Sequence, residues 1–201
     1  FSFSPFVFSL FLSPSFRTIG KSLTCIALLH AVLNIPSMVC EKSRRPLLNS
    51  VILVVPVNTV ANWENEFRKW ADHLDPSIRV SNLTDVNRNA RPTAIRGWEN
   101  RGGVLLLSDS LFTRLMGQDE YKDRLQCDIL VLDEAHTTLS NKSNASYKAL
   151  SNVKTPRRIA LTGSPVQNNL LEYYMMVNWI RPNIFGMTES MFDKTFVIPI
   201  T

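Results

Sequence analysis

From Gly20 onward, short apolar runs alternate with longer stretches in which apolar residues recur every three or four positions. The short runs are rich in β-branched residues and end in polar or turn-forming ones, which is typical of strands buried on both faces of a sheet. A weaker run at 78–81 predicts a short additional strand. The strong strand predictions cover VILVVP (51–56), GVLLLS (103–108), DILVLD (128–133) and RRIALT (157–162).

The longer stretches predict helices between these strands. One of them, NTVANWENEFRKW, places Val60, Trp63, Phe67 and Trp70 on one helical face, so we expect both tryptophans in the core. Parallel strands need a crossover of about a dozen residues, so this alternation predicts an α/β fold whose parallel sheet is covered on both sides. The other helices are predicted at 22–33, 93–100, 111–125, 146–153 and 170–180.

The composition agrees with one globular domain. The 201 residues are 45% hydrophobic and 19% charged, which excludes a chain that is disordered by composition. The net charge of +5 suits a nucleic-acid partner, but it suits an ordinary soluble protein equally well. Three cysteines without a C-x-x-C spacing predict neither a disulfide framework nor a zinc site, and they indicate a reducing, intracellular setting.

The first sixteen residues, FSFSPFVFSLFLSPSF, carry no charge. They are too short to span a bilayer comfortably and lack the basic leading region of a signal peptide, so we expect no membrane partner. Three Asn-x-Ser/Thr triplets would suit a secreted protein, an alternative that the unpaired cysteines disfavour. We expect residues 1–18 to be an apolar segment foreign to the fold, either an artefact of cloning or gene prediction or a disordered stretch.

A possible phosphate-binding loop begins the helix predicted at 22–33. Gly20, Lys21 and Ser22 are the last three letters of the pattern G-x-x-x-x-G-K-[ST]. In such a loop the backbone N–H groups surround phosphate and the lysine reaches the outer phosphates. Ser15 stands where the first glycine belongs. The motif therefore indicates either a nucleotide site with an incomplete loop or a chance match of three residues.

Two polar motifs follow predicted strands, at the sheet edge where ligands of parallel sheets bind. The first is Asp133-Glu134-Ala135-His136, and the second begins with Thr162-Gly163. Adjacent acids at a buried strand end need a cation or solvent, and phosphate-transfer sites use an acid at this position to hold Mg²⁺. The alternatives are solvated loop acids for the first motif and an ordinary loop with a helix cap for the second.

Taken in order, GKS, VILVVPVNTVANWENEFRKW, VLDEAH and IALTGSPVQNN resemble motifs I, Ia, II and III of the Swi/Snf-type DNA translocases, a branch of the superfamily-two helicases. The segments VVPVNTVANWENEFRKW, LTGSPVQNNLLEYYMMVNWIRPNIFG and MFDKTFVIPI resemble the ATRX-type subgroup of chromatin remodellers. The resemblance covers residues 19–200. It implies a RecA-like fold of the P-loop NTPase kind, a three-layer α/β sandwich with a mainly parallel central sheet.

The resemblance also implies ATP and Mg²⁺ as cofactors. Lys21 would contact the β and γ phosphates, and Ser22 and Asp133 would hold the metal ion. Glu134 would orient or deprotonate the attacking water, whereas His136 and the segment that ends at Gln167 would couple hydrolysis to motion. The implied nucleotide contacts are Gly20, Lys21, Ser22, Thr162 and Gly163.

Double-stranded DNA or chromatin is the implied partner, together with histone-binding or other chromatin proteins, in the nucleus. Loops of this kind grip the phosphate backbone, so DNA binding should depend on salt and hardly on sequence. The implied DNA contacts are Pro56, Asn58, Thr59, Ser108, Asp109, Ser110, Asn168 and Asn169. We expect the basic residues Lys42, Arg44, Arg45, Arg157 and Arg158 on a solvated face instead.

The chain departs from the family at the phosphate loop. The family's loop usually reads Asp-Glu-Met-Gly-Leu-Gly-Lys-Thr, whereas this chain has SFRTIGKS, so Thr18 replaces a glycine and the acids are missing. A β-branched residue where the chain needs φ > 0, or close approach to phosphate, costs about 1–3 kcal/mol. The loop is therefore expected to be a remnant.

These observations predict that residues 19–201 form the first RecA-like lobe, incomplete at its N-terminus and without a second lobe. Such a chain should not turn over ATP alone, because the second lobe would bring the arginines that stabilise the transferring phosphate. One alternative is a non-catalytic remnant that binds DNA or a protein. A less favoured alternative is a lobe of a DEAH-type RNA helicase, which the Asn-Trp-x-x-Glu-Phe-x-x-Trp helix argues against.

Overall fold

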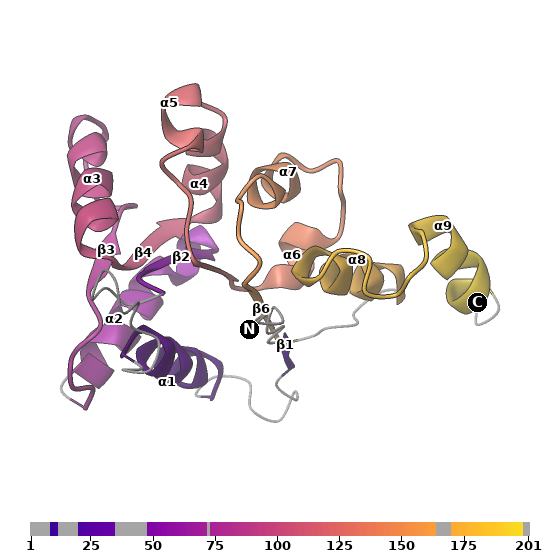
Figure 1. Cartoon of the computed structure of the whole chain (residues 1–201), viewed down its shortest axis with the longest axis horizontal. Coiled ribbons are helices and arrows are strands. Elements are labelled where there is room, and N and C mark those ends of the chain that lie inside the picture. The colour runs from indigo at the N-terminus through magenta and orange to yellow at the C-terminus, as the bar shows by residue number, and fades with distance from the viewer. Residues whose placement is uncertain (1–8, 12–19, 35–47, 72, 164–169, 199–201) are drawn as a thin grey trace, which may run out of the picture.

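Six parallel strands form the central sheet of the computed structural model, which describes residues 9–11, 20–34, 48–71, 73–163 and 170–198 (Figure 1). The strand order is β1-β6-β5-β2-β4-β3. β2 lies near the middle of the sheet, where it pairs in parallel with both β4 and β5. The strands are β1 (Ser9–Phe11), β2 (Ser50–Val55), β3 (Val80–Asn82), β4 (Gly103–Ser108), β5 (Ile129–Leu132) and β6 (Arg158–Thr162).

Helices cover both faces of this sheet (Figure 1). α1 (Gly20–Asn34) and α2 (Val60–Ala71) lie against one face. The other face is covered by α3 (Arg91–Arg101), α4 (Asp109–Met116), α5 (Asp119–Lys122), α6 (Ala135–Leu139), α7 (Ala145–Ser151) and α8 (Leu170–Ile180). The short elements are the 3₁₀-helices Val57–Thr59 and Arg88–Ala90, α9 (Glu189–Phe192) and a π-helical turn at Asp193–Val197. In the described residues, no helix is long and apolar enough to cross a membrane.

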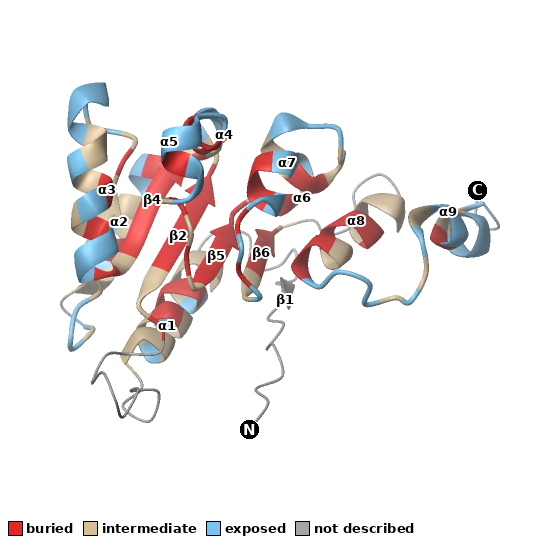
Figure 2. Cartoon of the chain, turned by 45° about the horizontal axis from the view of Figure 1, so that its top comes forward, coloured by how far each residue is buried: buried red, intermediate tan, exposed pale blue. Residues whose placement is uncertain are grey.

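Two apolar cores lie on the two faces of the sheet. Successive side chains of a strand point to opposite faces, so β2 places Ile52 and Val54 in one core and Val51, Leu53 and Val55 in the other. β2, β4, β5 and β6 are buried along most of their length, whereas the helices are buried mainly on the side that faces the sheet (Figure 2). The expected α/β fold with a parallel sheet covered on both sides is confirmed.

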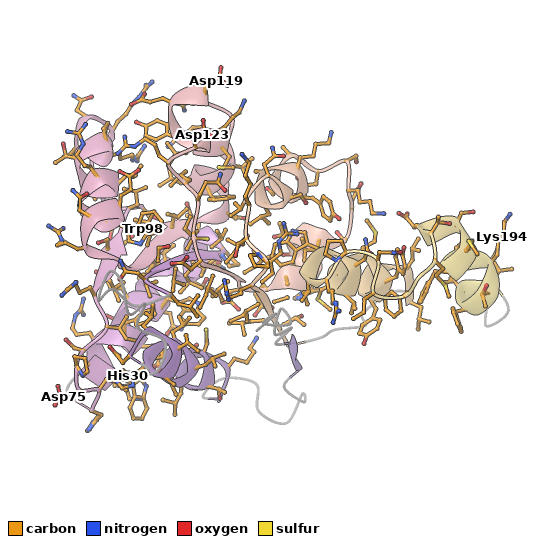
Figure 3. The ribbon with its side chains drawn as sticks, viewed as in Figure 1. His30, Asp75, Trp98, Asp119, Asp123 and Lys194 are labelled. Carbon is orange, nitrogen blue, oxygen red and sulfur yellow. The ribbon has the colours of Figure 1, made fainter. Side chains whose placement is uncertain are left out.

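The tryptophans anchor helices to these cores. Trp63 of α2 is buried as expected, whereas Trp70, two turns later, is only half-buried beside the same core. Trp98 lies on the sheet side of α3, where its indole N–H donates to the Gly103 carbonyl over 3.0 Å (Figure 3). The charged residues Asp119 and Lys194, in contrast, lie at the periphery, on α5 and near the C-terminus (Figure 3).

A smaller apolar cluster lies at the end of the molecule that is remote from α3 (Figure 1). Tyr174 of α8 packs against Phe185 and Phe192, with ring centroids 5.3 and 4.7 Å away. The Lys142 ammonium forms an ion pair with Glu189, which ties the loop before α7 to α9. The C-terminal elements therefore pack as a satellite of the main core.

The structure differs from the sequence predictions in several places. The helix predicted at 111–125 is two helices, because α4 ends at Met116 and Gly117 donates its N–H to the Thr113 and Leu115 carbonyls. α6 was not predicted. Of residues 1–18, which are expected to be foreign to the fold, the structure describes only Ser9–Phe11, and these pair with β6 as an edge strand. β6 would otherwise be an edge strand, and its unpaired backbone groups can pair with an extended segment of this kind.

The solvated position expected for Arg158 is wrong. Its guanidinium donates to the Trp179 carbonyl over 2.8 Å and to the Val153 carbonyl over 3.2 Å, and it lies over the Trp179 ring. Burial lowers the pKa of the Arg158 guanidinium, and no carboxylate pairs with it in the described part of the chain. This arginine therefore connects the start of β6 to the end of α8.

Candidate functional site

The carboxyl ends of four strands carry the sequence motifs to one edge of the sheet. All strands run the same way, so residue 56 after β2, residue 109 after β4, residue 133 after β5 and residue 163 after β6 lie along this edge. The strands β6, β5, β2 and β4 are neighbours in that order. The edge therefore gathers segments that are up to about 100 positions apart in the sequence, as expected for a ligand site in a parallel sheet.

Lys21 meets the acidic motif at this edge. Its ammonium Nζ lies 3.1 Å from Glu134 Oε1, and the two side chains are 15% and 33% exposed. Gly20 and Lys21 are the first two residues of α1, and Ser22 follows, half-buried. A Cβ atom at position 163 would lie 3.5 Å from Lys21 Nζ, so Gly163 lines the space around the ammonium. The GKS motif and the acids after β5, to which the family resemblance assigns a shared role in nucleotide binding, therefore lie side by side.

Asp133 is a buried carboxylate with two donors. Its Oδ2 accepts the indole N–H of Trp63 over 2.7 Å, and its Oδ1 accepts the backbone N–H of Glu134 over 2.9 Å. Burial raises the pKa of Asp133, and the nearby charge of Glu134 adds to this, whereas the two hydrogen bonds and Lys21 act in the opposite direction. Desolvation outweighs them, so the carboxylate lacks a full counter-charge.

Glu134 lies at a sharp turn between β5 and α6. Its backbone is left-handed, with φ 45° and ψ 47°, a conformation that is uncommon for residues other than glycine. This turn directs the side chain toward both Lys21 and His136, whose Nδ1 lies 3.4 Å from Glu134 Oε2. Strain of this kind is often found at functional sites, where surrounding contacts maintain it.

His136 joins the second polar motif to the first. Its Nδ1 lies 2.7 Å from the hydroxyl of Thr162, the last residue of β6, which is fully buried. Lys21, Glu134, His136 and Thr162 therefore form one chain of contacts across three elements. We call these four residues the strand-end network. The sequence predicted its members, but not the order in which they touch.

A buried thiol lies behind this network. Cys25, one helical turn after Lys21, is 1% exposed. Burial, together with the charge of Asp133, raises the pKa of the Cys25 thiol to about 12. The thiol therefore stays protonated at neutral pH and acts as an apolar packing group rather than as a nucleophile.

The segments expected to contact DNA lie on the same edge, with different accessibility. Asn58 is exposed in the 3₁₀-helix that follows Pro56, and the Thr59 hydroxyl donates to the Pro56 carbonyl over 2.9 Å. Ser108 is only 2% exposed, and its hydroxyl caps α4 by accepting the Leu111 N–H. The accessible groups after β4 are therefore those of Asp109 and Ser110. Gln167, Asn168 and Asn169 lie outside the described residues.

Trp63 is the site residue that sequence reasoning missed. The helical periodicity placed it in the core, which is correct, but the partner of its indole N–H was not considered. A buried tryptophan usually donates its indole N–H to an acceptor. The acidic residues at the predicted strand ends were the candidate acceptors that the sequence offered.

The strand-end site offers oxygen ligands of the kind that bind Mg²⁺. No group of three or more His, Cys, Asp or Glu side chains that could hold a metal is present in the described part of the chain. Mg²⁺ in nucleotide sites, however, is bound by one or two protein oxygens together with phosphates and water. Asp133, a carboxylate short of positive charge, and the Ser22 hydroxyl are donors of this kind.

Comparisons with known proteins agree with this geometry. The model of the family described as SNF2-related domain matches residues 17–201. The chain is 35% identical over 197 residues to "Transcriptional regulator ATRX" of Mus musculus and 36% identical over 193 residues to "Protein CHROMATIN REMODELING 20" of Arabidopsis thaliana, with 90% of the chain covered in each case.

The fold is also found in solved structures. The Sulfolobus solfataricus SWI2/SNF2 ATPase core in complex with dsDNA matches 90% of the chain with a TM-score of 0.67 and 23% identity. The expected RecA-like architecture is thereby confirmed. The chain spans 33% of that structure, and only 8% and 12% of the Mus musculus and Arabidopsis thaliana proteins.

Proposed function

Because the chain belongs to the family of SNF2-related domains, we propose that it is the first nucleotide-binding lobe of an ATP-dependent translocase of double-stranded DNA, of the chromatin-remodelling kind. The observation that carries this proposal is the 3.1 Å contact between Lys21 and Glu134, which brings together the two motifs expected to form a nucleotide site. The setting would be the nucleus, and the partners would be DNA or chromatin with its histone-binding proteins. The relatives named above motivate this setting.

In this proposal Lys21 binds the outer phosphates of ATP, while Gly20, Thr162 and Gly163 line the site. Phosphate oxygens would replace Glu134 as the partner of the Lys21 ammonium. This exchange would release Glu134 Oε1, which could then accept a proton from an attacking water. Glu134 would thus change its partner as nucleotide enters. Because His136 contacts both Glu134 and Thr162, this change would alter the contacts of Thr162 and of the segment after β6.

Mg²⁺ would be held by Asp133 and the Ser22 hydroxyl, and when bound it would neutralise charge on the phosphates. The raised pKa of Asp133 supports this assignment, because a cation beside a desolvated carboxylate stabilises its charged form. The donated N–H groups of Trp63 and Glu134 hold the carboxylate in one orientation. The metal would therefore meet a fixed ligand.

DNA would lie across the edge formed by residues 56–59 and 109–110, with Gln167, Asn168 and Asn169 as further contacts. The exposed Asn58 amide and Ser110 hydroxyl are suited to phosphate oxygens rather than to base edges. Binding should accordingly weaken steeply as salt rises and should differ little between sequences. Asp109 would face the duplex through its backbone, because phosphates repel its carboxylate, which already accepts the Ser110 N–H.

A second candidate function is a lobe that binds DNA or a protein partner without hydrolysing ATP. Thr18 favours it, because it replaces a glycine of the family's phosphate loop, and Ser15 adds to this, because the general phosphate-loop pattern has a glycine at that position. The two candidates share the fold and differ in whether Lys21 binds phosphate.

Titration of the 201-residue chain with Mg·ADP, followed by two-dimensional NMR, tests the proposal and tolerates weak binding. We expect signals of residues around Lys21, Asp133 and Glu134 to shift, and Lys21→Ala to abolish the shifts. Lys148→Ala, which removes an exposed lysine on α7, is the matched control and should leave them intact. Shifts that survive Lys21→Ala would refute the proposed site, and duplex binding without any nucleotide response would support the second candidate.

A further inference from the structure

The contact between Trp63 and Asp133 links two parts of the proposed site that are otherwise separate. Trp63 is 1% exposed and belongs to α2, whereas Asp133 is 7% exposed and directly follows β5. The indole Nε1 donates to Asp133 Oδ2 over 2.7 Å. A hydrogen bond to an ionised acceptor is about twice as strong as one between neutral groups, and burial strengthens it further. The indole is therefore held tightly to the carboxylate.

The carboxylate has little freedom to move without this indole moving too. Its other oxygen accepts the Glu134 N–H, and the Asp133 N–H donates to the Val54 carbonyl over 2.9 Å. The backbone of Asp133 is thus fixed by β2, and the side chain is fixed by Trp63 and by its own neighbour. Of these three contacts, only the one with Trp63 comes from a helix, because the other two are made by a strand and by the adjacent backbone.

That helix begins at the segment proposed to contact DNA. α2 starts at Val60, directly after the 3₁₀-helix Val57–Thr59, and Trp63 lies one helical turn beyond Thr59. Thr59 donates both its N–H and its hydroxyl to the Pro56 carbonyl, each over 2.9 Å, so the segment is itself a closed turn. A phosphate that displaces residues 56–59 would therefore move α2 and the indole together.

We propose that Trp63 is a positioning residue that couples DNA contact at residues 56–59 to metal and nucleotide binding at Asp133. This inference rests on the proposed function and adds a route between its two ligands. The coupling acts in both directions, because a ligand that shifts α2 and a ligand that fixes Asp133 each change the affinity for the other. DNA bound at residues 56–59 would thereby change the position of the Asp133 carboxylate, and so its affinity for the metal, through the side chain of Trp63.

The same helix offers a matched control. Trp70, seven residues after Trp63, donates its indole N–H to Glu66 Oε2 over 3.2 Å within α2 and does not touch the sheet edge. Trp63→Phe and Trp70→Phe each remove one indole hydrogen bond and one ring nitrogen from α2. Only the first removes a donor from Asp133.

The first measurement compares the affinity for ADP with Mg²⁺ and with EDTA in the two variants and the unmodified chain. We expect Trp63→Phe to lose about tenfold in affinity for Mg·ADP, since it removes one charge-assisted hydrogen bond, and to keep the affinity for ADP in EDTA. Trp70→Phe should match the unmodified chain in both conditions. A loss of general stability would lower both affinities together, so the dependence on Mg²⁺ separates positioning from misfolding.

The second measurement uses the unmodified chain, so it does not depend on the folding of Trp63→Phe. The chain has four tryptophans, and their indole N–H signals in an NMR spectrum can be assigned by replacing Trp70, Trp98 and Trp179 one at a time. We expect the Trp63 signal to shift with Mg·ADP and, separately, with a short DNA duplex. The Trp70 signal should shift far less in both titrations.

The outcomes distinguish this inference from the function on which it rests. Absence of any response to Mg·ADP in the unmodified chain would overturn both. A normal response to Mg·ADP combined with an unchanged Mg²⁺ dependence in Trp63→Phe would overturn the positioning role alone. A Trp63 signal that moves with Mg·ADP but not with the duplex would overturn the coupling to DNA.

Discussion

The ion pair between Lys21 and Glu134 predicts that removing the negative charge of Glu134 tightens nucleotide binding. In the structure the Lys21 ammonium is engaged by this carboxylate, so phosphate must compete with it. Glu134→Gln keeps the size of the side chain and an oxygen that can accept from Lys21, but it ends the competition between charges. The same change removes a negative charge beside the incoming phosphates.

The size of the effect follows from the geometry of the pair. Exposed ion pairs contribute about 0.2–1 kcal/mol. This pair, at 3.1 Å with side chains 15% and 33% exposed, belongs at or slightly above the top of that range. A competing interaction of about 1–1.4 kcal/mol corresponds to a 5- to 10-fold change in Kd. We therefore expect Glu134→Gln to bind Mg·ADP about 5- to 10-fold more tightly than the unmodified chain.

A second ion pair of similar burial provides the control. Arg124 and Glu99 are 2.9 Å apart, and their side chains are 23% and 30% exposed. Glu99→Gln changes the net charge by the same amount but lies on α3, away from the strand ends. Calorimetric titrations with Mg·ADP at one fixed salt concentration should show tightening for Glu134→Gln only. Equal or weaker binding by Glu134→Gln, or equal tightening by Glu99→Gln, would refute the competition argument.

Three other outcomes test the phosphate loop, the buried arginine and the buried acid. The double variant Ser15→Gly/Thr18→Gly should bind Mg·ADP at least several-fold more tightly, because about 1–3 kcal/mol of strain is relieved, whereas hydrolysis by the 201-residue chain should stay at background even with duplex DNA. Equal affinities, or turnover stimulated by DNA, would contradict this. Arg158→Ala should lower the free energy of unfolding, measured in urea, by about 2–4 kcal/mol, because the Trp179 and Val153 carbonyls lose their donor. The control Arg157→Ala should change the free energy of unfolding by less than about 0.5 kcal/mol. Similar values for the two variants would contradict the bonding role of Arg158. The free energy of unfolding of the nucleotide-free chain should fall relative to that of Asp133→Asn as pH rises above about 4, because a carboxyl whose folded pKa is raised loses its favourable contribution as pH rises; a difference that does not change with pH would contradict it.

The strands were the most predictable part of the fold. β2, β4, β5 and β6 lie within two residues of the predicted limits, because strands covered on both faces leave an uninterrupted apolar run. α6 was not predictable in this way. It has five residues, too few for a periodic pattern, and it follows a residue whose left-handed backbone is set by the turn rather than by its type. The split between α4 and α5 at Gly117 was signalled by that glycine.

The residue types of the site were predictable, because a lysine after glycine and acids after a strand have few other uses at the carboxyl edge of a sheet. Their contacts were not. Glu134 reaches both Lys21 and His136 only because its backbone is left-handed. Ser108 was expected to face DNA, but its place at the start of α4 engages its hydroxyl as a cap.

The strand order explains why the contact of Trp63 with Asp133 could not be derived from the sequence. Periodicity fixes the face of α2 that is buried, but it does not say which strand end lies beneath that face. β2 could have neighboured any of the other strands, and only its pairing with β5 brings the helix that follows β2 over Asp133. The coupling proposed for Trp63 is therefore a property of the topology. A protein with the same residues but with another strand between β2 and β5 would lack the contact between Trp63 and Asp133, and therefore the coupling.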